Sequence, residues 1–185
     1  MKRVLVPLAP GFEEVEALTA VDYLRRAGAH VVTASVGAKN PIAGKHRIRV
    51  MADIDLSEAL AEWGEDFAAV VLPGGPAVQA LAENDEIVGL VKNRLERGEL
   101  TGAICAAPLV LAKAGLATAT RITSWPGVRQ DLAAYTNYSE DLVVREGHVI
   151  TSRGPGTSVA FALALVEALF GADKAEEIRK DTVSL

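Results

Sequence analysis

Short apolar segments alternate with helical stretches along the chain, and this alternation constrains the fold more than any other feature of the sequence. Residues 4–8 and 68–72 are almost wholly apolar, and each segment runs into a turn that contains proline and glycine. Strands that are apolar throughout are typical of parallel sheets whose two faces are both covered by helices. The sequence therefore predicts an α/β fold with a mostly parallel central sheet.

The other elements follow from the same patterns of apolar spacing and turn residues. Further strands are predicted at residues 31–36, 102–104 and 121–124, and hairpins at residues 41–50 and 142–150. Helices are predicted at residues 13–27, 108–113, 158–170 and 174–180, with helical segments after the turn at residue 75 as far as about residue 97. There is no internal repeat, low-complexity segment or linker, so residues 1–185 are expected to form one domain.

Charge and composition exclude several classes of protein. The 185 residues are 50% hydrophobic, and 19 Lys and Arg against 24 Asp and Glu give a net charge of −5. This balance leaves no surplus of cations for a phosphate backbone, so nucleic acid is not expected as the main partner. No apolar run reaches the roughly 18 residues of a membrane span. We therefore expect a cytoplasmic protein without a membrane segment, and the single cysteine excludes an internal disulfide.

The loop after the first strand is acidic rather than glycine-rich. It carries Glu13, Glu14 and Glu16 but only one glycine, Gly11, and the chain contains no GxGxxG or Walker sequence. A phosphate site at the carboxyl edge of a parallel sheet needs bare backbone N–H groups, and three carboxylates would repel a phosphate. No nucleotide cofactor is expected. The carboxylates could simply complement the dipole of the first helix, although one on its inward face would lean into the crevice.

Cys105 lies where a predicted strand runs directly into a helix. Small residues stand two positions before it (Ala103) and two positions after it (Ala107). This spacing is typical of a nucleophile elbow, in which a sharp turn raises the reactive side chain above the sheet edge. The start of the following helix favours thiolate over thiol. The alternative is a buried cysteine that packs like an alanine.

Two further features bear on chemistry at this edge. The turn at Gly74 and Gly75 could point backbone N–H groups at a developing oxyanion, or could be no more than a tight turn. Of the histidines other than His46, His30 starts a predicted strand and His148 lies in a predicted hairpin. Because no two histidines and no Cys-His pair have metal-ligand spacing, no zinc or other metal site is expected.

Several spaced motifs together resemble the ThiJ/PfpI superfamily, and within it the branch of the Parkinsonism-associated deglycase and its bacterial relatives. In chain order, the motifs are APGFEEVE at 9–16, VD at 21–22, RRAG at 25–28, VLPGG at 71–75, AICAAP at 103–108 and TSRGPGT at 151–157. The resemblance covers almost the whole chain. It implies a flavodoxin-like three-layer α/β sandwich and a homodimer formed partly through the first helix.

The resemblance also implies roles for particular residues. Cys105 falls on the family's reactive nucleophile, and Glu16 falls on a glutamic acid that is hydrogen-bonded to the sulfur. A carboxyl group desolvated beside a thiolate has a raised pKa, and once neutral it can donate a hydrogen bond. The family's backbone donors near the substrate oxygen fall on Gly74, Gly75 and Ala106. Arg26 falls on a position near the site across the dimer interface.

Three positions depart from the family pattern. Trp125, in Thr123-Ser124-Trp125-Pro126, stands where members with glyoxalase chemistry have a histidine facing the cysteine. A general acid or base contributes about 10²–10⁴ in rate where it acts, so this change weakens the case for an enzyme. His46 replaces an arginine expected in the inserted hairpin. Ala106 replaces the histidine of protease-like members, which disfavours a Cys-His peptidase.

The leading functional hypothesis is a cofactor-free enzyme acting on small aldehydes such as methylglyoxal, or on the early adducts that they form on proteins and nucleotides. Cys105 would attack the carbonyl carbon, and water would release a hydroxy acid such as lactate. The alternative hypothesis is an oxidation-sensing stress protein with chaperone-like activity and no turnover. A third, weaker hypothesis is hydrolysis of another small substrate, because one fold hosts many reactions.

Overall fold

A seven-stranded sheet forms the centre of the computed structural model, which describes residues 1–184. The strand order is β5-β2-β1-β6-β7-β9-β8, and every neighbouring pair is parallel except β8 and β9. The strands are β1 (Arg3–Leu8), β2 (His30–Ser35), β5 (Ile54–Asp55), β6 (Ala69–Leu72), β7 (Thr101–Ile104), β8 (Val143–Glu146) and β9 (Val149–Ser152). A separate two-stranded hairpin consists of β3 (Ile42–Ala43) and β4 (Arg49–Val50).

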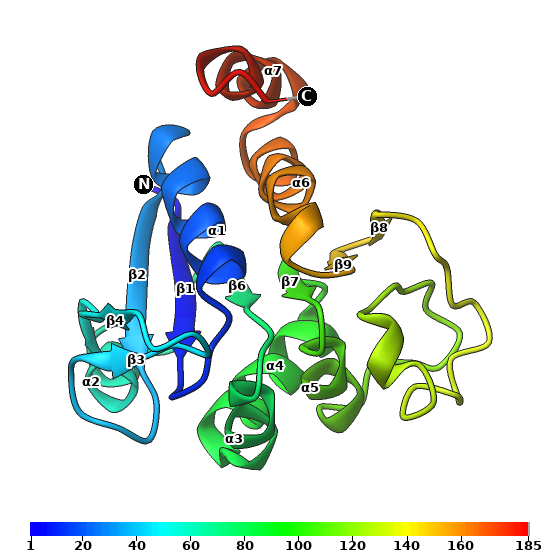
Figure 1. Cartoon of the computed structure of the whole chain (residues 1–185), viewed down its shortest axis with the longest axis horizontal. Helices are drawn as coiled ribbons and strands as arrows, with labels where there is room; N and C mark the ends of the chain where they lie inside the picture. Colours follow the sequence, from blue (N-terminus) through cyan, green and yellow to red (C-terminus); the bar gives the residue numbers. More distant parts are fainter. Residues whose placement is uncertain (185) are drawn as a thin grey trace.

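The helices form two groups around this sheet. They are α1 (Glu14–Arg26), α2 (Leu56–Trp63), α3 (Ala77–Glu83), α4 (Asp85–Arg97), α5 (Pro108–Lys113), α6 (Ser158–Phe170) and α7 (Ala172–Asp181). In Figure 1, α1 lies beside α6, and α7 lies next to α6, in agreement with their contacts. Helices α3, α4 and α5 contact one another as a second group. The predicted flavodoxin-like α/β fold, with its mostly parallel sheet, is confirmed.

Burial of the central strands explains why the apolar runs form this sheet. All residues of β6 and β7 are buried, and all but the first residue of β1 are buried. Because β1, β6 and β7 are parallel neighbours, the loops that follow them meet at one edge of the sheet. Glu13 follows β1, with Glu16 in the first turn of α1 just after it, Gly74 and Gly75 follow β6, and Cys105 follows β7. The topology therefore brings the candidate residues of three distant segments together.

The chain differs from the predicted elements in two places. The strand expected at residues 121–124 is wrong, because only one isolated bridge, from Ile122 to Tyr138, forms there. The backbone here is bound in other ways: the Thr123 N–H donates to the Thr151 hydroxyl (2.9 Å), and the N–H of Trp125, just after the segment, donates to the Cys105 carbonyl (2.9 Å). The second difference is that β5 and α2 were not predicted, although an N-cap aspartate and a terminal glycine bound the helix.

A buried arginine connects α4 to the central strands. Arg94 is 0% exposed, and its guanidinium donates to the carbonyls of Phe67 (2.8 Å) and Leu100 (2.9 Å). Phe67 lies just before β6, and Leu100 immediately precedes β7. The carboxylate of Glu99 lies 3.1 Å from the same group. Burial lowers the pKa of Arg94, and the charge of Glu99 opposes that effect. The arginine therefore supplies a donor to the Phe67 carbonyl and a second donor to the Leu100 carbonyl, which also accepts from the Val70 N–H (3.2 Å).

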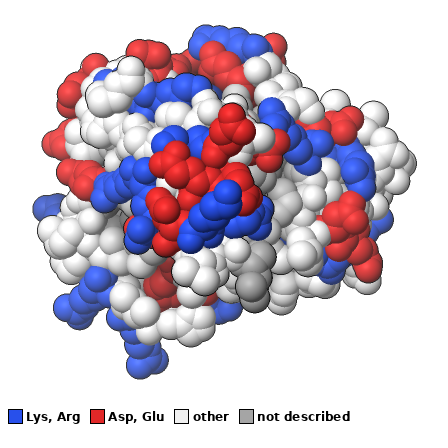
Figure 2. All heavy atoms as spheres, turned by 90° about the horizontal axis from the view of Figure 1, so that it is seen from above, with Lys and Arg blue, Asp and Glu red and all other residues white. Residues whose placement is uncertain are grey.

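Charge is mixed on the surface seen in Figure 2. Lys and Arg side chains are interspersed with Asp and Glu, and this face shows no continuous basic area. Within residues 1–184, no helix has both the length and the apolar character needed to cross a membrane.

Candidate active site

Cys105 occupies a strained turn between β7 and α5. Its φ of 64° lies in the left-handed region, which residues other than glycine rarely adopt. Ala103 and Ala107 on either side are both 0% exposed, so larger side chains would not fit there. The Cys105 N–H donates to the Ser152 carbonyl (2.9 Å), which continues the pairing of β7 with β9 through the turn. The geometry is that of a nucleophile elbow.

Glu16 lies in the first turn of α1 and is 0% exposed. One carboxyl oxygen, Oε2, accepts a hydrogen bond from the Gly74 N–H at 2.8 Å. The other oxygen, Oε1, is buried without a conventional partner among residues 1–184. The Cys105 thiol interacts with this carboxyl group closely enough to shift the pKa of both groups. The structure thus brings the predicted cysteine and glutamate together.

The two groups form a coupled pair. Burial raises the pKa of Glu16 from an ordinary value of 4.5 to about 7. Burial and then the charge of Glu16 raise the pKa of Cys105 to about 12, whereas the N–H groups of Gly75 and Ala106 lower it. The expected lowering of the thiol pKa by the helix start is therefore outweighed, first by burial and further by the charge of Glu16. A proton on Glu16 removes that charge and supplies a donor to the sulfur, so the thiolate is favoured beside the neutral acid.

The two glycines of the β6 turn have different roles. The N–H of Gly74 donates to Glu16, and its expected role near a substrate oxygen stays a prediction. Gly75 has a φ of 87°, and a Cβ there would lie 2.8 Å from the Glu13 nitrogen, so only glycine fits. Its N–H and that of Ala106 reach the cysteine sulfur instead. These two donors remain available at the reacting atom.

Cys105 opens into a cavity of about 350 Å³. The other lining residues are Glu13, Lys45, Gly75, Pro76, Ala106, Trp125 and Pro155. Trp125, which is 50% exposed, forms part of the wall, as its place in the sequence suggested. No histidine lines this cavity. Sequence reasoning did not identify Lys45, Pro76 or Pro155 as lining residues, because nothing in their local sequence signals contact with Cys105.

Glu14 and His46 form a separate contact beside the cavity. The Glu14 carboxylate accepts from the His46 N–H (2.7 Å) and lies 3.1 Å from its Nδ1. Burial acts to raise the pKa of Glu14, but hydrogen bonds from its own backbone and from His46 hold it below the ordinary value. Glu13, Glu14 and His46 together have the donor types for a metal ion, a grouping that sequence spacing did not reveal. However, Glu13 caps the Glu16 N–H (2.9 Å), so the carboxylates already serve α1 and the hairpin.

Other candidate residues lie away from this cavity. Arg26 is at the far end of α1 and pairs with Asp22 at 2.7 Å, so it does not reach the Cys105 of its own chain. Its expected place across a dimer interface stays a prediction. His30 packs edge-on against Trp63, and His148 lines two other cavities.

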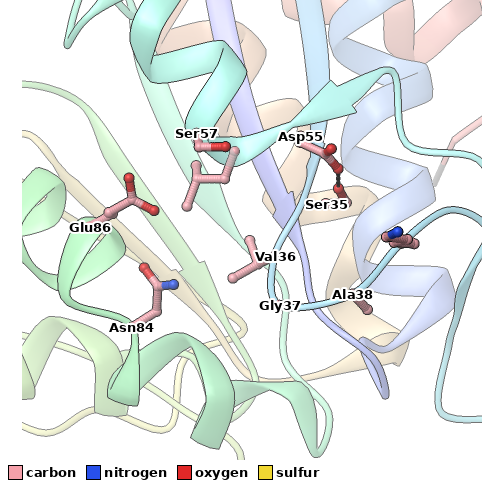
Figure 3. Close-up of a pocket in the computed structure, with 10 residues that line it drawn as sticks. Ser35, Val36, Gly37, Ala38, Asp55, Ser57, Asn84 and Glu86 are labelled. Carbon is pink, nitrogen blue, oxygen red and sulfur yellow. Dashed lines mark hydrogen bonds between the residues drawn. The ribbon is translucent and has the colours of Figure 1, made fainter.

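A second cavity of about 230 Å³ opens at the same edge of the sheet (Figure 3). Three of its polar side chains already have partners: Ser35 donates to Asp55, and Asn84 accepts from the Ile87 N–H (2.9 Å) at the start of α4. Neither cysteine nor histidine lines it. Of the two cavities, only the one at Cys105 offers a nucleophile.

The raised pKa of Glu16 predicts a specific dependence of stability on pH. The folded protein binds this proton more tightly than the unfolded chain does, so the stabilisation is fully present below pH 4.5 and is lost as the pH rises to about 7. We expect the free energy of unfolding, measured in urea, to fall by about 3 kcal/mol more in the wild type than in Glu16→Gln between pH 4.5 and 8. Glu62→Gln, at an exposed position, controls for loss of one charge. Parallel curves for wild type and Glu16→Gln would contradict the assignment.

The fold and this geometry define a class of flavodoxin-like α/β proteins with a cysteine at a nucleophile elbow. The model of the DJ-1/PfpI family matches residues 2–168, and the chain belongs to this family. It is 39% identical over 181 residues to the protein dj-1beta of Drosophila melanogaster, a match that covers 97% of this chain and 95% of the relative. This chain also superposes on the crystal structure of Drosophila melanogaster DJ-1beta with a TM-score of 0.93 and 38% identity. The match covers 100% of this chain and 98% of that structure.

A relative from Caenorhabditis elegans carries the name of an activity. The glutathione-independent glyoxalase DJR-1.2 is 35% identical over 181 residues, which is 97% of this chain and 95% of that protein. The family therefore includes a protein named as a glyoxalase.

Proposed function

We propose that this protein is a cysteine-dependent enzyme that converts small reactive carbonyls, such as methylglyoxal, to hydroxy acids without a cofactor. The observation that carries the proposal is the buried Cys105–Glu16 pair at the end of a small cavity. The backbone donors of Gly75 and Ala106 at the same sulfur support it. The glyoxalase name of the relative from Caenorhabditis elegans favours carbonyl chemistry over other reactions of cysteine.

The proposed reaction is an internal redox step followed by hydrolysis. The Cys105 sulfur forms a bond to the aldehyde carbon of methylglyoxal, and the aldehyde oxygen becomes the hydroxyl group of a hemithioacetal. A proton then moves from this carbon to the neighbouring ketone carbon through an enediol. The aldehyde carbon is thereby oxidised to a thioester while the ketone is reduced to an alcohol. Water cleaves the thioester to lactate and restores the thiol, so no external oxidant is needed.

Glu16 is the acid and base that this sequence of steps requires. With its pKa near 7, it can hold a proton in the resting state and can also accept one from the hemithioacetal. Gly75 and Ala106 donate to the developing oxyanion. This assignment explains how turnover could proceed with Trp125 in place of an imidazole, because Glu16 already touches the reacting sulfur. The same chemistry could release the early adducts of such aldehydes from proteins or nucleotides.

Lactate production from methylglyoxal tests the proposal. We expect purified wild-type protein to form lactate, Cys105→Ala to fall to the rate of buffer alone, and Glu16→Ala to lose about 10²–10⁴ in rate. Circular dichroism of each variant checks that it is folded. Equal rates in all three proteins would overturn the proposal.

We also propose that the protein acts as a homodimer in which α1 contributes to the interface. Val15 and Leu18 on α1 are large apolar side chains that are 51% and 36% exposed, and Ile48 and Met51 are exposed near the hairpin. Exposed apolar side chains gathered on one helix favour a protein partner over solvent. The oxidation-sensing alternative has less support, because a relative is named for glyoxalase activity.

A further inference from the structure

We propose that the Lys45 ammonium is a specificity-determining group that binds a carboxylate on the carbonyl compounds that react with Cys105. This inference rests on the proposed function and adds a substrate class to it. Lys45 and Cys105 line the same cavity of about 350 Å³. The preferred substrates would then carry a carboxylate beside the reactive carbonyl, or on the thiol or amine to which the aldehyde is attached.

The backbone around Lys45 is fixed on both sides. The Lys45 N–H donates to the Phe12 carbonyl at 2.8 Å, and the Gly44 N–H donates to the Ile48 carbonyl at 2.9 Å. Glu14 holds the next residue, His46, through its backbone and its ring. A Cβ on Gly44 would overlap the Glu14 carboxyl group, so the turn that precedes Lys45 packs closely against the Glu14 side chain. The lysine is therefore presented from an anchored turn.

The charge of Lys45 is not taken up elsewhere. Its Nζ makes no hydrogen bond or ion pair with any other residue in the 1–184 range. The neighbouring cation candidate, His46, faces Glu14 at 3.1 Å. Glu13 also lines the cavity, but one of its oxygens caps the Glu16 N–H at 2.9 Å. The positive charge of Lys45 reaches the reacting pair, since it lowers the pKa of Glu16.

The balance of charge selects a carboxylate over a phosphate. The cavity wall offers a single ammonium group and a single carboxylate, Glu13. One lysine can pair with one negative charge, and Glu13 repels a phosphate with nearly two charges about twice as strongly as it repels a carboxylate. The remaining walls, which include Trp125, Pro76 and Pro155, suit the small carbon skeleton of such a compound.

Alkylation of the single cysteine tests this inference without requiring turnover. Iodoacetate and iodoacetamide place the same carbon on the sulfur with loss of iodide, but only iodoacetate carries a carboxylate. We expect Lys45→Gln to lower the ratio of the iodoacetate rate to the iodoacetamide rate about fivefold at low salt, measured by intact mass. Taking the ratio cancels any change in the reactivity of the thiol itself. Lys45→Arg should keep the wild-type ratio.

Arg49→Gln is the matched control, because Arg49 is an exposed cation on the same hairpin that does not line the cavity. It should leave the ratio unchanged. An equal ratio in wild type and Lys45→Gln, or an equal fall in Arg49→Gln, would overturn the inference even if methylglyoxal is turned over. Absence of lactate with a lowered ratio would instead overturn the proposed function and leave the carboxylate site standing.

Turnover gives a second readout. In the hemithioacetals of methylglyoxal with N-acetylcysteine and with its neutral amide, Cys105 would displace the bound thiol, whose bond to the aldehyde carbon breaks and which leaves with the proton of Cys105. The two compounds differ only in the carboxylate. We expect Lys45→Gln to raise KM for the carboxylate compound about fivefold more than KM for the amide, and this ratio cancels any change that reaches both compounds through Glu16. Equal changes in KM for both compounds would contradict a role in specificity.

Discussion

Replacing Gly74 with alanine is expected to reduce carbonyl turnover about 100-fold, although Gly74 itself carries no reactive group. A Cβ at this position would lie 2.6 Å from the Cys105 Cβ and 2.6 Å from Glu16 Oε2. Real Cβ atoms essentially never approach so closely, so the cysteine, the carboxyl group or the turn must move. A displacement of about 1 Å at reacting groups can cost about 100-fold in rate. The measurement is kcat/KM for lactate formation from methylglyoxal.

Gly89→Ala is the matched control for this substitution. Gly89 lies inside α4, and a Cβ there would meet nothing within 4 Å. Alanine is the better helix former by about 1 kcal/mol, so this variant should be at least as stable as the wild type and fully active. If Gly74→Ala retains wild-type turnover, the close packing of Cys105, Glu16 and the β6 turn is not needed for the reaction.

Replacing Arg94 with leucine is expected to cause the largest loss of stability. The substitution removes a fully buried cation, leaves the Phe67 carbonyl without its Arg94 donor, and removes one of the two donors to the Leu100 carbonyl. Breaking a buried charged interaction by removing one partner costs about 3–5 kcal/mol. For a chain of this size, that corresponds to a fall in Tm of about 6–20 °C. Thermal unfolding followed by circular dichroism measures it.

Lys92→Leu introduces the same side chain at an exposed position on the same helix. Lys92 lies 4.0 Å from Glu96, and both side chains are mostly exposed, so we expect a change within about 0.5 kcal/mol. A Tm for Arg94→Leu close to that of Lys92→Leu would show that α4 is held by its apolar contacts alone.

Most of the fold could be predicted from the sequence because its signals are local. The apolar strands β6 and β7 and the long helix α6 are bounded by glycine or proline turns, and their pattern alone predicts them. The strand predicted at residues 121–124 is wrong because an apolar residue between turns does not reveal which segment its backbone binds. The Thr123 N–H donates to the side chain of Thr151, and the N–H of Trp125, just after this segment, donates to the carbonyl of Cys105, so the partners lie in other segments.

The same distinction applies to the site. The spacing of small residues around Cys105 and the acidic loop with Glu16 are local patterns, so both could be proposed from the sequence. The hydrogen bond from the Gly74 N–H to Glu16 joins residues 58 positions apart, so no local sequence pattern predicts it. The place of Lys45 on the cavity wall depends on how the β3–β4 hairpin folds over α1, and this too is a tertiary effect.

The central claim is that Cys105 forms a covalent bond to the substrate during turnover. Intact mass and peptide mapping of protein quenched in acid while it consumes methylglyoxal test this claim most directly. We expect one added methylglyoxal unit on the peptide that contains Cys105, formed early and lost as lactate accumulates, with none in Cys105→Ala. Lactate production with adducts only on lysine and arginine peptides, and none on Cys105, would contradict the account.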